Sequence, residues 1–331
     1  MPRQARIDAL GALQHTIIRG IEKKAIFRDD LDRNNFLQRL GTIPLETSTP
    51  CFAWALLPNH AHLLLRSGLT PIATLMRRLL TAYAQYFNRR HHRHGQLFQN
   101  RYKSILCEEE PYLLELVRYI HLNPLRAGLV KDLDGLGSYR YSGHAVLIGK
   151  EEHQWQVKDY LLALFGKTQE QARVQYVSYV ALGANQGRRP ELVGGGLRRS
   201  LGGWSALTDC RMGSPRIKGD ERILGGGDFV EKVLREAEET LTEITHLKRQ
   251  GLGWDGLMER VMVEFDITRE DLTEGRKERR VVRSRSVLCY WAVRKLRMTV
   301  TEVALKLRIT PSAVSRLVSR GQHFIQEGQL E

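Results

Sequence analysis

The stretch PNHAHLLLR, residues 58–66, holds a turn, two histidines and an apolar run. Pro58-Asn59 is a turn signal between two apolar segments, so Pro50–Leu57 and His60–Arg66 are predicted to form a β-hairpin. Residues two apart in a strand share a face, which places His60 and His62 together while Ala61 points into the core. Two imidazoles on one face are a candidate metal site, and a pair of ordinary surface or core histidines is the equally compatible alternative.

The sequence around this hairpin alternates strands with helices. Strands are predicted at Leu13–Arg19 and Tyr102–Cys107, which are rich in β-branched or alternating apolar residues. Three helices are expected: Asp29–Leu40 with an Asp29 or Asp30 N-cap, a helix opened by Thr70-Pro71 that runs to about Arg90, and Tyr112 to about Leu122, ended by Pro124. This order is typical of an α+β fold, an antiparallel sheet with helices packed on it.

Length and composition favour two domains and a polyanionic partner. The chain has 331 residues, a formal net charge of +14 and a pI of about 9.8. Nucleic acid and an anionic membrane are both compatible with this charge, as is a solvated basic surface. No apolar run is long enough for a transmembrane helix and no signal peptide is visible, so a cytoplasmic protein is expected. The four cysteines form no CxxC pair, which argues against a zinc knuckle.

The positive charge is concentrated in two segments. From Arg77 to Lys103 there are seven Lys or Arg and no acid, and from Arg276 to Arg320 there are thirteen Lys or Arg against two acids. Two separate basic segments suggest two contacts with nucleic acid, one in each half of the chain.

Glycines mark a change in organisation after the first domain. Twelve of the 29 glycines lie between Gly183 and Gly227, which indicates a linker, since the segment lacks the GxxxxGK[ST] pattern of a phosphate-binding loop. The predicted domains are residues 1–150, a helical and Gly-rich connector at 151–227, and a helical DNA-binding domain at 228–331. Within these, Glu151–Val180 and Asp228–Arg249 are expected to be helical.

The C-terminal segment has the pattern of a helix-turn-helix. Thr299 and Glu302 form a capping box that opens one helix, and Thr310-Pro311 opens the next after a link of about three residues. A short-linked pair with a basic second helix is a candidate for duplex DNA binding, and a helical bundle with a basic exterior is the alternative.

A second chemical motif is YIHLN at residues 119–123. Tyr119 and Asn123 are four apart on a predicted helix, so a phenol and a side-chain amide would project from the same face. For either residue alone, an interfacial tyrosine and a helix-ending asparagine are the better interpretation.

The motifs together are more specific than any one of them. PNHAHLLL, a basic helix and then RYIHLNPLRAGLV resemble the tyrosine transposases of the His-hydrophobic-His (HUH) superfamily, in particular the REP-associated branch. MPRQARIDALGALQHTIIRG and DDLDRNNFLQRL are similar to the same branch. The resemblance is close over residues 1–150 and looser beyond, where RILGGGDFVEKVL is similar to long members.

The resemblance implies a fold, a chemistry and a substrate. The fold is a ferredoxin-like antiparallel sheet with flanking helices, and the activity is cleavage and strand transfer of single-stranded DNA near REP-like hairpins through a 5′-phosphotyrosine intermediate. Tyr119 takes the place of the nucleophile, and His60, His62 and Asn123 take the places of ligands to Mg²⁺ or Mn²⁺. Ala61 is smaller than the usual hydrophobic residue between the histidines but still apolar.

The same resemblance implies where DNA is bound. Phosphate contacts are expected from the first basic segment, at Arg77, Arg78, Arg89, Arg90, Arg93, Arg101 and Lys103. His91, His92 and His94 add to this segment or form a second metal site. The C-terminal segment resembles the helix-turn-helix domain of the bacterial replication initiator DnaA, with Ser312, Ser315, Arg316 and Arg320 near or on its recognition helix. A non-catalytic hairpin-binding or regulatory protein is the alternative function, and the sequence does not distinguish a monomer from a homodimer.

Overall fold

The chain is divided into two compact units, Met1–Leu234 and Arg235–Glu331, and each is described by itself. The computed structural model describes residues 7, 9, 11–68, 70–187, 189–193, 220–237, 253–274, 278–296 and 298–326. Most of the Gly-rich segment and Cys210 lie outside the described residues. No described helix has the length and apolarity needed to cross a membrane.

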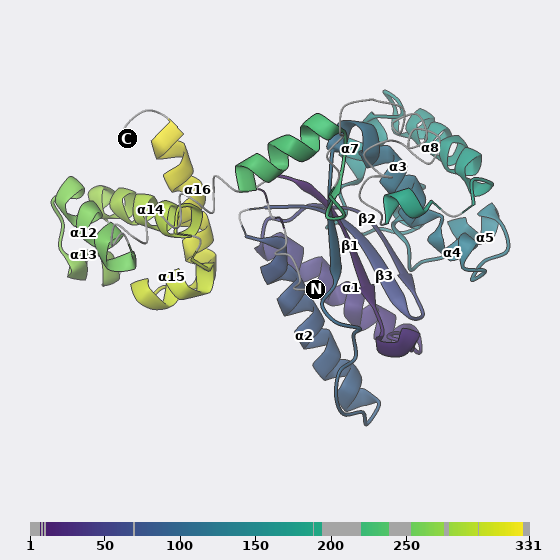
Figure 1. Cartoon of the computed structure of the whole chain (residues 1–331), viewed down its shortest axis with the longest axis horizontal. Coiled ribbons are helices and arrows are strands. Elements are labelled where there is room, and N and C mark those ends of the chain that lie inside the picture. Colours follow the sequence, from purple (N-terminus) through teal and green to yellow (C-terminus); the bar gives the residue numbers. More distant parts are fainter. Residues whose placement is uncertain are drawn as a thin grey trace, which may run out of the picture. The chain divides into compact units, whose positions relative to one another are not determined.

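The first unit is built on a five-stranded sheet of order β2-β3-β1-β4-β5 (Figure 1). Its strands are β1 (Leu13–Arg19), β2 (Cys51–Leu57), β3 (His60–Arg66), β4 (Lys103–Cys107) and β5 (Ile223–Leu224). Adjacent strands among the first four are antiparallel, in a ferredoxin-like arrangement, as the resemblance implied. The expectation of a wholly antiparallel sheet was wrong at one edge, because β5 pairs parallel to β4.

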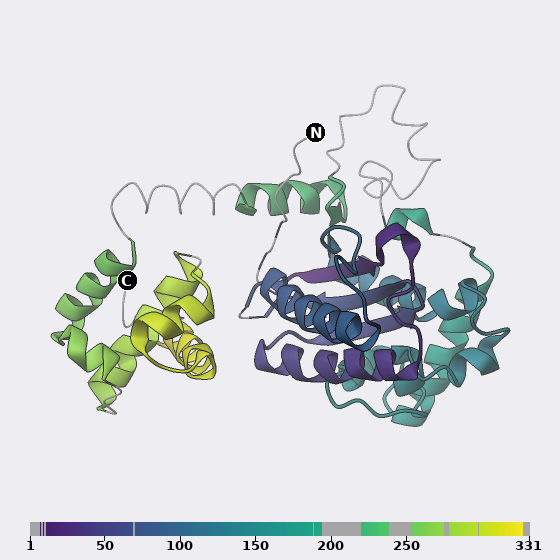
Figure 2. The same cartoon turned by 90° about the horizontal axis from the view of Figure 1, so that it is seen from below.

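Helices cover both faces of this sheet (Figures 1 and 2). On one face, α1 (Asp30–Glu46) and α2 (Ile72–Arg90) pack side by side and bury Ala61 and Leu63 of β3. On the other face, α3 (Glu109–His121) and α8 (Gln169–Ala184) pack over Leu64. The predicted orientation of Ala61 is thereby confirmed, and the two histidines beside it face α3.

The starts of α1 and α2 differ in how well they were predicted. Asp29 caps α1 as expected, since its carboxylate accepts a hydrogen bond from the Asp32 amide. The predicted Thr70 cap of α2 is wrong, because Pro71 occupies the N-cap position in an extended conformation and no side chain caps the helix. Thr70 therefore lies one residue too early to reach the first free amides.

The residues after α3 form short helices on the same face of the sheet. These are α4 (Asn123–Arg126), α5 (Leu133–Gly137), α6 (Gly143–Leu147) and α7 (Lys158–Ala163). The helical stretch expected at 151–180 is two helices, because Thr168 caps a new helix, α8, after the break that includes Gly166. Residue Tyr176 of α8 is fully buried in the core under β2 and α3. Of the helix expected at Asp228–Arg249, residues up to 237 are helical, and residues 238–249 lie outside the described residues.

The second unit is all-helical over its described residues. It contains α12 (Trp254–Phe265), α13 (Arg269–Thr273), α14 (Arg279–Arg294), α15 (Val300–Leu307) and α16 (Pro311–Gln326). The predicted capping box is confirmed, with Thr299 and Glu302 bonded to each other's backbone amides. Helix α15 ends at Arg308 in a left-handed conformation, and α16 begins three residues later.

Candidate functional site

The sheet and α3 bring the two motif histidines and Tyr119 together. His60 and His62 lie on β3 with ring centroids 5.2 Å apart. Tyr119, on α3, meets His62 edge-on at 5.9 Å between centroids. Two residues that are 57 positions apart in sequence thus form one site, as the resemblance implied.

His15 is a member of this cluster that sequence reasoning missed. It lies on β1, stacks on His62 at 5.1 Å and meets Tyr119 at 6.0 Å. Its Nε2 is 2.9 Å from Nδ1 of His62. The alternation of LQHTIIR puts His15 on one strand face with Leu13 and Ile17, but only the pairing of β1 with β3 shows that this face holds His62.

Burial keeps the three imidazoles neutral. It lowers the pKa of His60 to about 4, with a smaller effect from the charge of Arg19. Burial likewise lowers the pKa of His15 to about 4 and holds the pKa of His62 well below its usual value. Since only the neutral ring offers a lone pair, the site is in the state that metal binding requires.

Asn123 lies next to Tyr119, but the prediction that both residues belong to one helix was wrong. Helix α3 ends at His121, and Asn123 is the first residue of α4. Its amide nitrogen donates to the carbonyl of Tyr119 at 2.9 Å and to that of Ile120 at 3.4 Å. Its side-chain oxygen accepts no hydrogen bond from the described residues.

The residues present fit an open divalent-cation site. Among the described residues no group of three or more His, Cys, Asp or Glu side chains is arranged to hold a metal. Two imidazoles and an amide oxygen would therefore supply only part of the coordination, and a substrate phosphate or water would supply the rest. Such incomplete sites are typical where a metal acts on a bound phosphate.

Two arginines flank Tyr119, and neither was singled out from the sequence. Arg126 lies 5.5 Å from the centre of the Tyr119 ring, and its Nε and Nη1 are buried with no hydrogen-bond partner in the described part of the chain. Arg19, on β1, lies directly opposite His60 of β3 in the strand register, and its side chain is exposed. Burial raises the pKa of Tyr119, and the charges of Arg126 and Arg19 oppose that rise.

The predicted phosphate contacts of the first basic segment fall into two groups. Arg78 pairs with Glu46, Arg90 with Asp29 and Asp32, and the Lys103 ammonium donates to the carbonyl of Val193.

By contrast, Arg77, Arg89 and Arg101 are exposed, and within the described ranges they have no ion pair or hydrogen bond. Arg93 bonds to Asn88 and to the Gln96 carbonyl without a carboxylate partner. Of the neighbouring histidines, His91 is bonded to Asp32.

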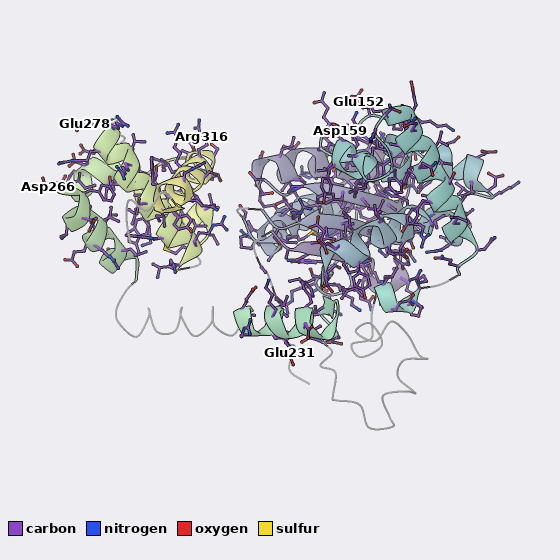
Figure 3. All side chains as sticks on the ribbon, turned by 90° about the horizontal axis from the view of Figure 1, so that it is seen from above. Glu152, Asp159, Glu231, Asp266, Glu278 and Arg316 are labelled. Carbon is purple, nitrogen blue, oxygen red and sulfur yellow. The ribbon has the colours of Figure 1, made fainter. Side chains whose placement is uncertain are left out.

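The candidates in the second basic segment lie on the surface of α16. Ser312, Arg316 and Arg320 are exposed and Ser315 is half-buried. The side chain of Arg316 projects from the outer side of its unit (Figure 3). The exposure of Ser312, Arg316 and Arg320 is what a nucleic-acid contact on α16 requires.

The first unit thus has a ferredoxin-like sheet with two histidines on an interior strand that face a tyrosine on a packed helix, the arrangement that the resemblance to tyrosine-dependent HUH proteins implied. Residues 11–123 match the family model of IS200-like transposases. A solved structure described as a REP-associated tyrosine transposase bound to a REP hairpin is similar at 15% identity and a TM-score of 0.37. The similarity covers 47% of this chain and 91% of that one. No curated protein matches the chain.

Proposed function

We propose that the protein is a DNA strand transferase that cuts single-stranded DNA beside a hairpin and joins itself to the 5′ side of the break through Tyr119. The observation that carries this proposal is the meeting of His60 and His62, on β3, with Tyr119, which comes from a separate element, α3. The match of residues 11–123 to IS200-like transposases supports the same chemistry.

The proposed step exchanges one phosphodiester for another. The Tyr119 hydroxyl oxygen attacks phosphorus, the bond from phosphorus to the 3′-oxygen breaks, and that oxygen leaves with a proton as a 3′-hydroxyl. The proton of Tyr119 leaves as the new bond forms. Because the phosphoester is retained on the enzyme, a second 3′-hydroxyl can reverse the step and join a new strand without ATP.

Each residue of the site has a task in this step. Arg126 and Arg19, whose charges act on Tyr119, would stabilise the negative charge that builds up on the phosphate and on the tyrosine oxygen. His60, His62 and Asn123 would hold Mg²⁺ or Mn²⁺, and such an ion, when bound, polarises the scissile phosphate. Imidazole ligands favour manganese over magnesium, so Mn²⁺ is expected to support the reaction at least as well.

A cleft formed by the loop after β1 suits a nucleotide of the DNA strand. It has a volume of about 210 Å³ and is lined by Ile21, Lys24, Ala25, Arg28, Arg93 and Leu97. The loop that forms one wall is tied to the hairpin turn before His60, since the Gly20 amide donates to the Asn59 carbonyl at 2.9 Å. Cations around an apolar floor are suited to a nucleotide with its phosphate. Arg93 and Arg28 are therefore proposed as contacts to the strand.

A labelled single-stranded hairpin incubated with protein and Mn²⁺ tests the proposal. Wild type is expected to release a product with a free 3′-hydroxyl and to form a protease-sensitive covalent adduct, and Tyr119→Phe is expected to form neither. Tyr112→Phe, on the same helix, is the control and should behave as wild type. If wild type binds the hairpin but does not cut it in the presence of any divalent metal tested, the function as a non-catalytic binding protein replaces this proposal.

A further inference from the structure

Residues Arg189–Val193, a segment beyond the matched residues 11–123, lie against the strands that carry the site. The Leu192 carbonyl is 3.3 Å from Nδ1 of His15 on β1, and the Val193 carbonyl accepts from Lys103 on β4 at 2.6 Å. Arg189 bonds to Glu115 on α3, the helix of Tyr119, at 3.2 Å. We call this segment the 189–193 strap.

The contact with the strap determines how the protons of two histidines are placed. A carbonyl oxygen only accepts, so the His15 nitrogen that faces Leu192 carries a hydrogen. His15 is fully buried and no carboxylate contacts it among the described residues, which favours a single proton on the ring. Nε2 of His15 then carries a lone pair and can only accept. The hydrogen bond of 2.9 Å between this atom and Nδ1 of His62 therefore requires that Nδ1 of His62 is the donor. The remaining nitrogen of His62, Nε2, is left with a lone pair.

The second histidine is placed in the same way by its neighbour. Nδ1 of His60 is 2.7 Å from the side-chain oxygen of Asn59, and the amide nitrogen of Asn59 donates to the Lys23 carbonyl at 3.2 Å. The oxygen therefore faces the imidazole and accepts a hydrogen bond from Nδ1–H of His60. Both histidines then expose Nε2 lone pairs on the face of the sheet that holds Tyr119.

We propose that His15, anchored by the Leu192 carbonyl of the strap, is a positioning residue that fixes His62 in its Nδ1–H form and presents Nε2 to a divalent cation. The inference rests on the proposed function, because it assumes a cation at His60 and His62. The site is then completed by the 189–193 strap, which lies outside the matched residues 11–123. Partners of this kind typically change metal affinity by about 10- to 100-fold.

Three variants separate the two hydrogen bonds of His15. His15→Gln keeps an oxygen near the position of Nε2 and can still accept from His62. His15→Asn keeps a polar group near Nδ1, so it can bond to Leu192 but not to His62. His15→Phe keeps a ring against His62 and Tyr119 and loses both bonds. Thermal unfolding of each variant shows whether it is folded.

Two measurements are made on the full chain. Nitrogen-15 spectra of the ring nitrogens in the metal-free protein are expected to show His62 protonated at Nδ1 in wild type and in His15→Gln, and a mixture of forms in His15→Asn. Titration with Mn²⁺ is expected to give a dissociation constant about 10- to 100-fold higher for His15→Asn and His15→Phe, and close to wild type for His15→Gln.

The outcomes distinguish this inference from the proposed function. Protonation of His62 at Nε2 in wild type, or equal Mn²⁺ affinity in folded His15→Asn and wild type, overturns the role of His15 and leaves the cleavage chemistry standing. Absence of Mn²⁺ binding in wild type, with His62 protonated at Nδ1, contradicts the metal site of the proposed function instead.

Discussion

Tyr119 is partly buried, and this burial opposes its proposed chemistry. Removal from water raises the pKa of its hydroxyl, so the residue is protonated at neutral pH and is a weak nucleophile on its own. The charges of Arg126 and Arg19 act in the opposite direction. The burial is useful once DNA is bound, because charges act more strongly where water is excluded.

Arg126 tests this balance. Arg126→Gln removes the charge while keeping a side chain that can bond to the Gly183 carbonyl. The cleavage rate is expected to fall about 100-fold, as for the loss of one donor to a transition-state oxygen, while hairpin affinity changes little. Single-turnover cleavage and a binding titration measure the two effects. Arg173→Gln is the control, and an equal loss of rate in that variant would show that position 126 has no special role.

The residues of this site were predictable where their spacing along the sequence places their side chains on the same face. His60 and His62 are two apart in a strand, so their shared face follows from the strand period. His15 could not be found in this way, because its contact with His62 depends on the register of β1 against β3. Arg126 gave no signal either, since an arginine in a basic protein is most often solvated.

At the scale of elements, a buried network joins α3, α6 and α8. The Tyr176 hydroxyl lies 2.7 Å from Nδ1 of His121 and 2.8 Å from Nδ1 of His144. Burial lowers the pKa of His144 to about 4 and holds that of His121 well below its usual value. The unfolded chain takes up these protons near pH 6.5, so it binds more protons than the folded chain between about pH 6.5 and 4. Stability therefore falls as the pH drops through this window.

His144→Asn is expected to reduce that loss. Asparagine does not titrate, so the variant lacks the contribution of His144, which amounts to about 2 kcal/mol at pH 5. Denaturant unfolding at pH 7 and pH 5 should show a smaller difference for the variant than for wild type. If the stability of the two proteins changed equally between pH 7 and pH 5, His144 would take up its proton in the folded chain as it does in the unfolded chain, which would contradict the prediction.

Helix α16 makes a separate prediction. Arg316 and Arg320 are exposed and have no ion pair in the described part of the chain. If α16 binds duplex DNA, Arg316→Ala and Arg320→Ala should each weaken binding and reduce the slope of log affinity against log salt by about 0.9. Arg269→Ala is the control, because Arg269 is exposed but already paired with Asp255. Unchanged slopes in both α16 variants would favour a helical bundle with a solvated basic face.

Elements were predictable where local pattern and local structure agree. The limits expected for β1 and β3 are those of the structure, since alternation and a turn signal bound them. Strand β5 was not foreseen, because its two residues form a strand only by pairing with β4. The split between α7 and α8 was missed although the sequence marks it, since Gly166 lies in the break and Thr168 caps the next helix.

At the scale of the whole molecule, the chain forms two units with separate cores. Leu79 is fully buried in the first unit and Leu288 in the second. Replacing either with Ala should destabilise its own unit by about 2–5 kcal/mol. Calorimetry of the full chain should therefore show two transitions, with Leu79→Ala lowering one and Leu288→Ala the other. A single transition that both variants shift equally would show that the units unfold together.

The central claim is that Tyr119 becomes joined to DNA, and peptide mapping of the adduct tests it most directly. Trypsin cuts after Arg118 and Arg126 and releases YIHLNPLR, a peptide with a single tyrosine. After reaction with the hairpin and nuclease digestion, mass spectrometry is predicted to find a nucleotide phosphate on Tyr119 of that peptide. An adduct on another residue, or cleavage that leaves a free 5′-phosphate and no adduct, would contradict the account.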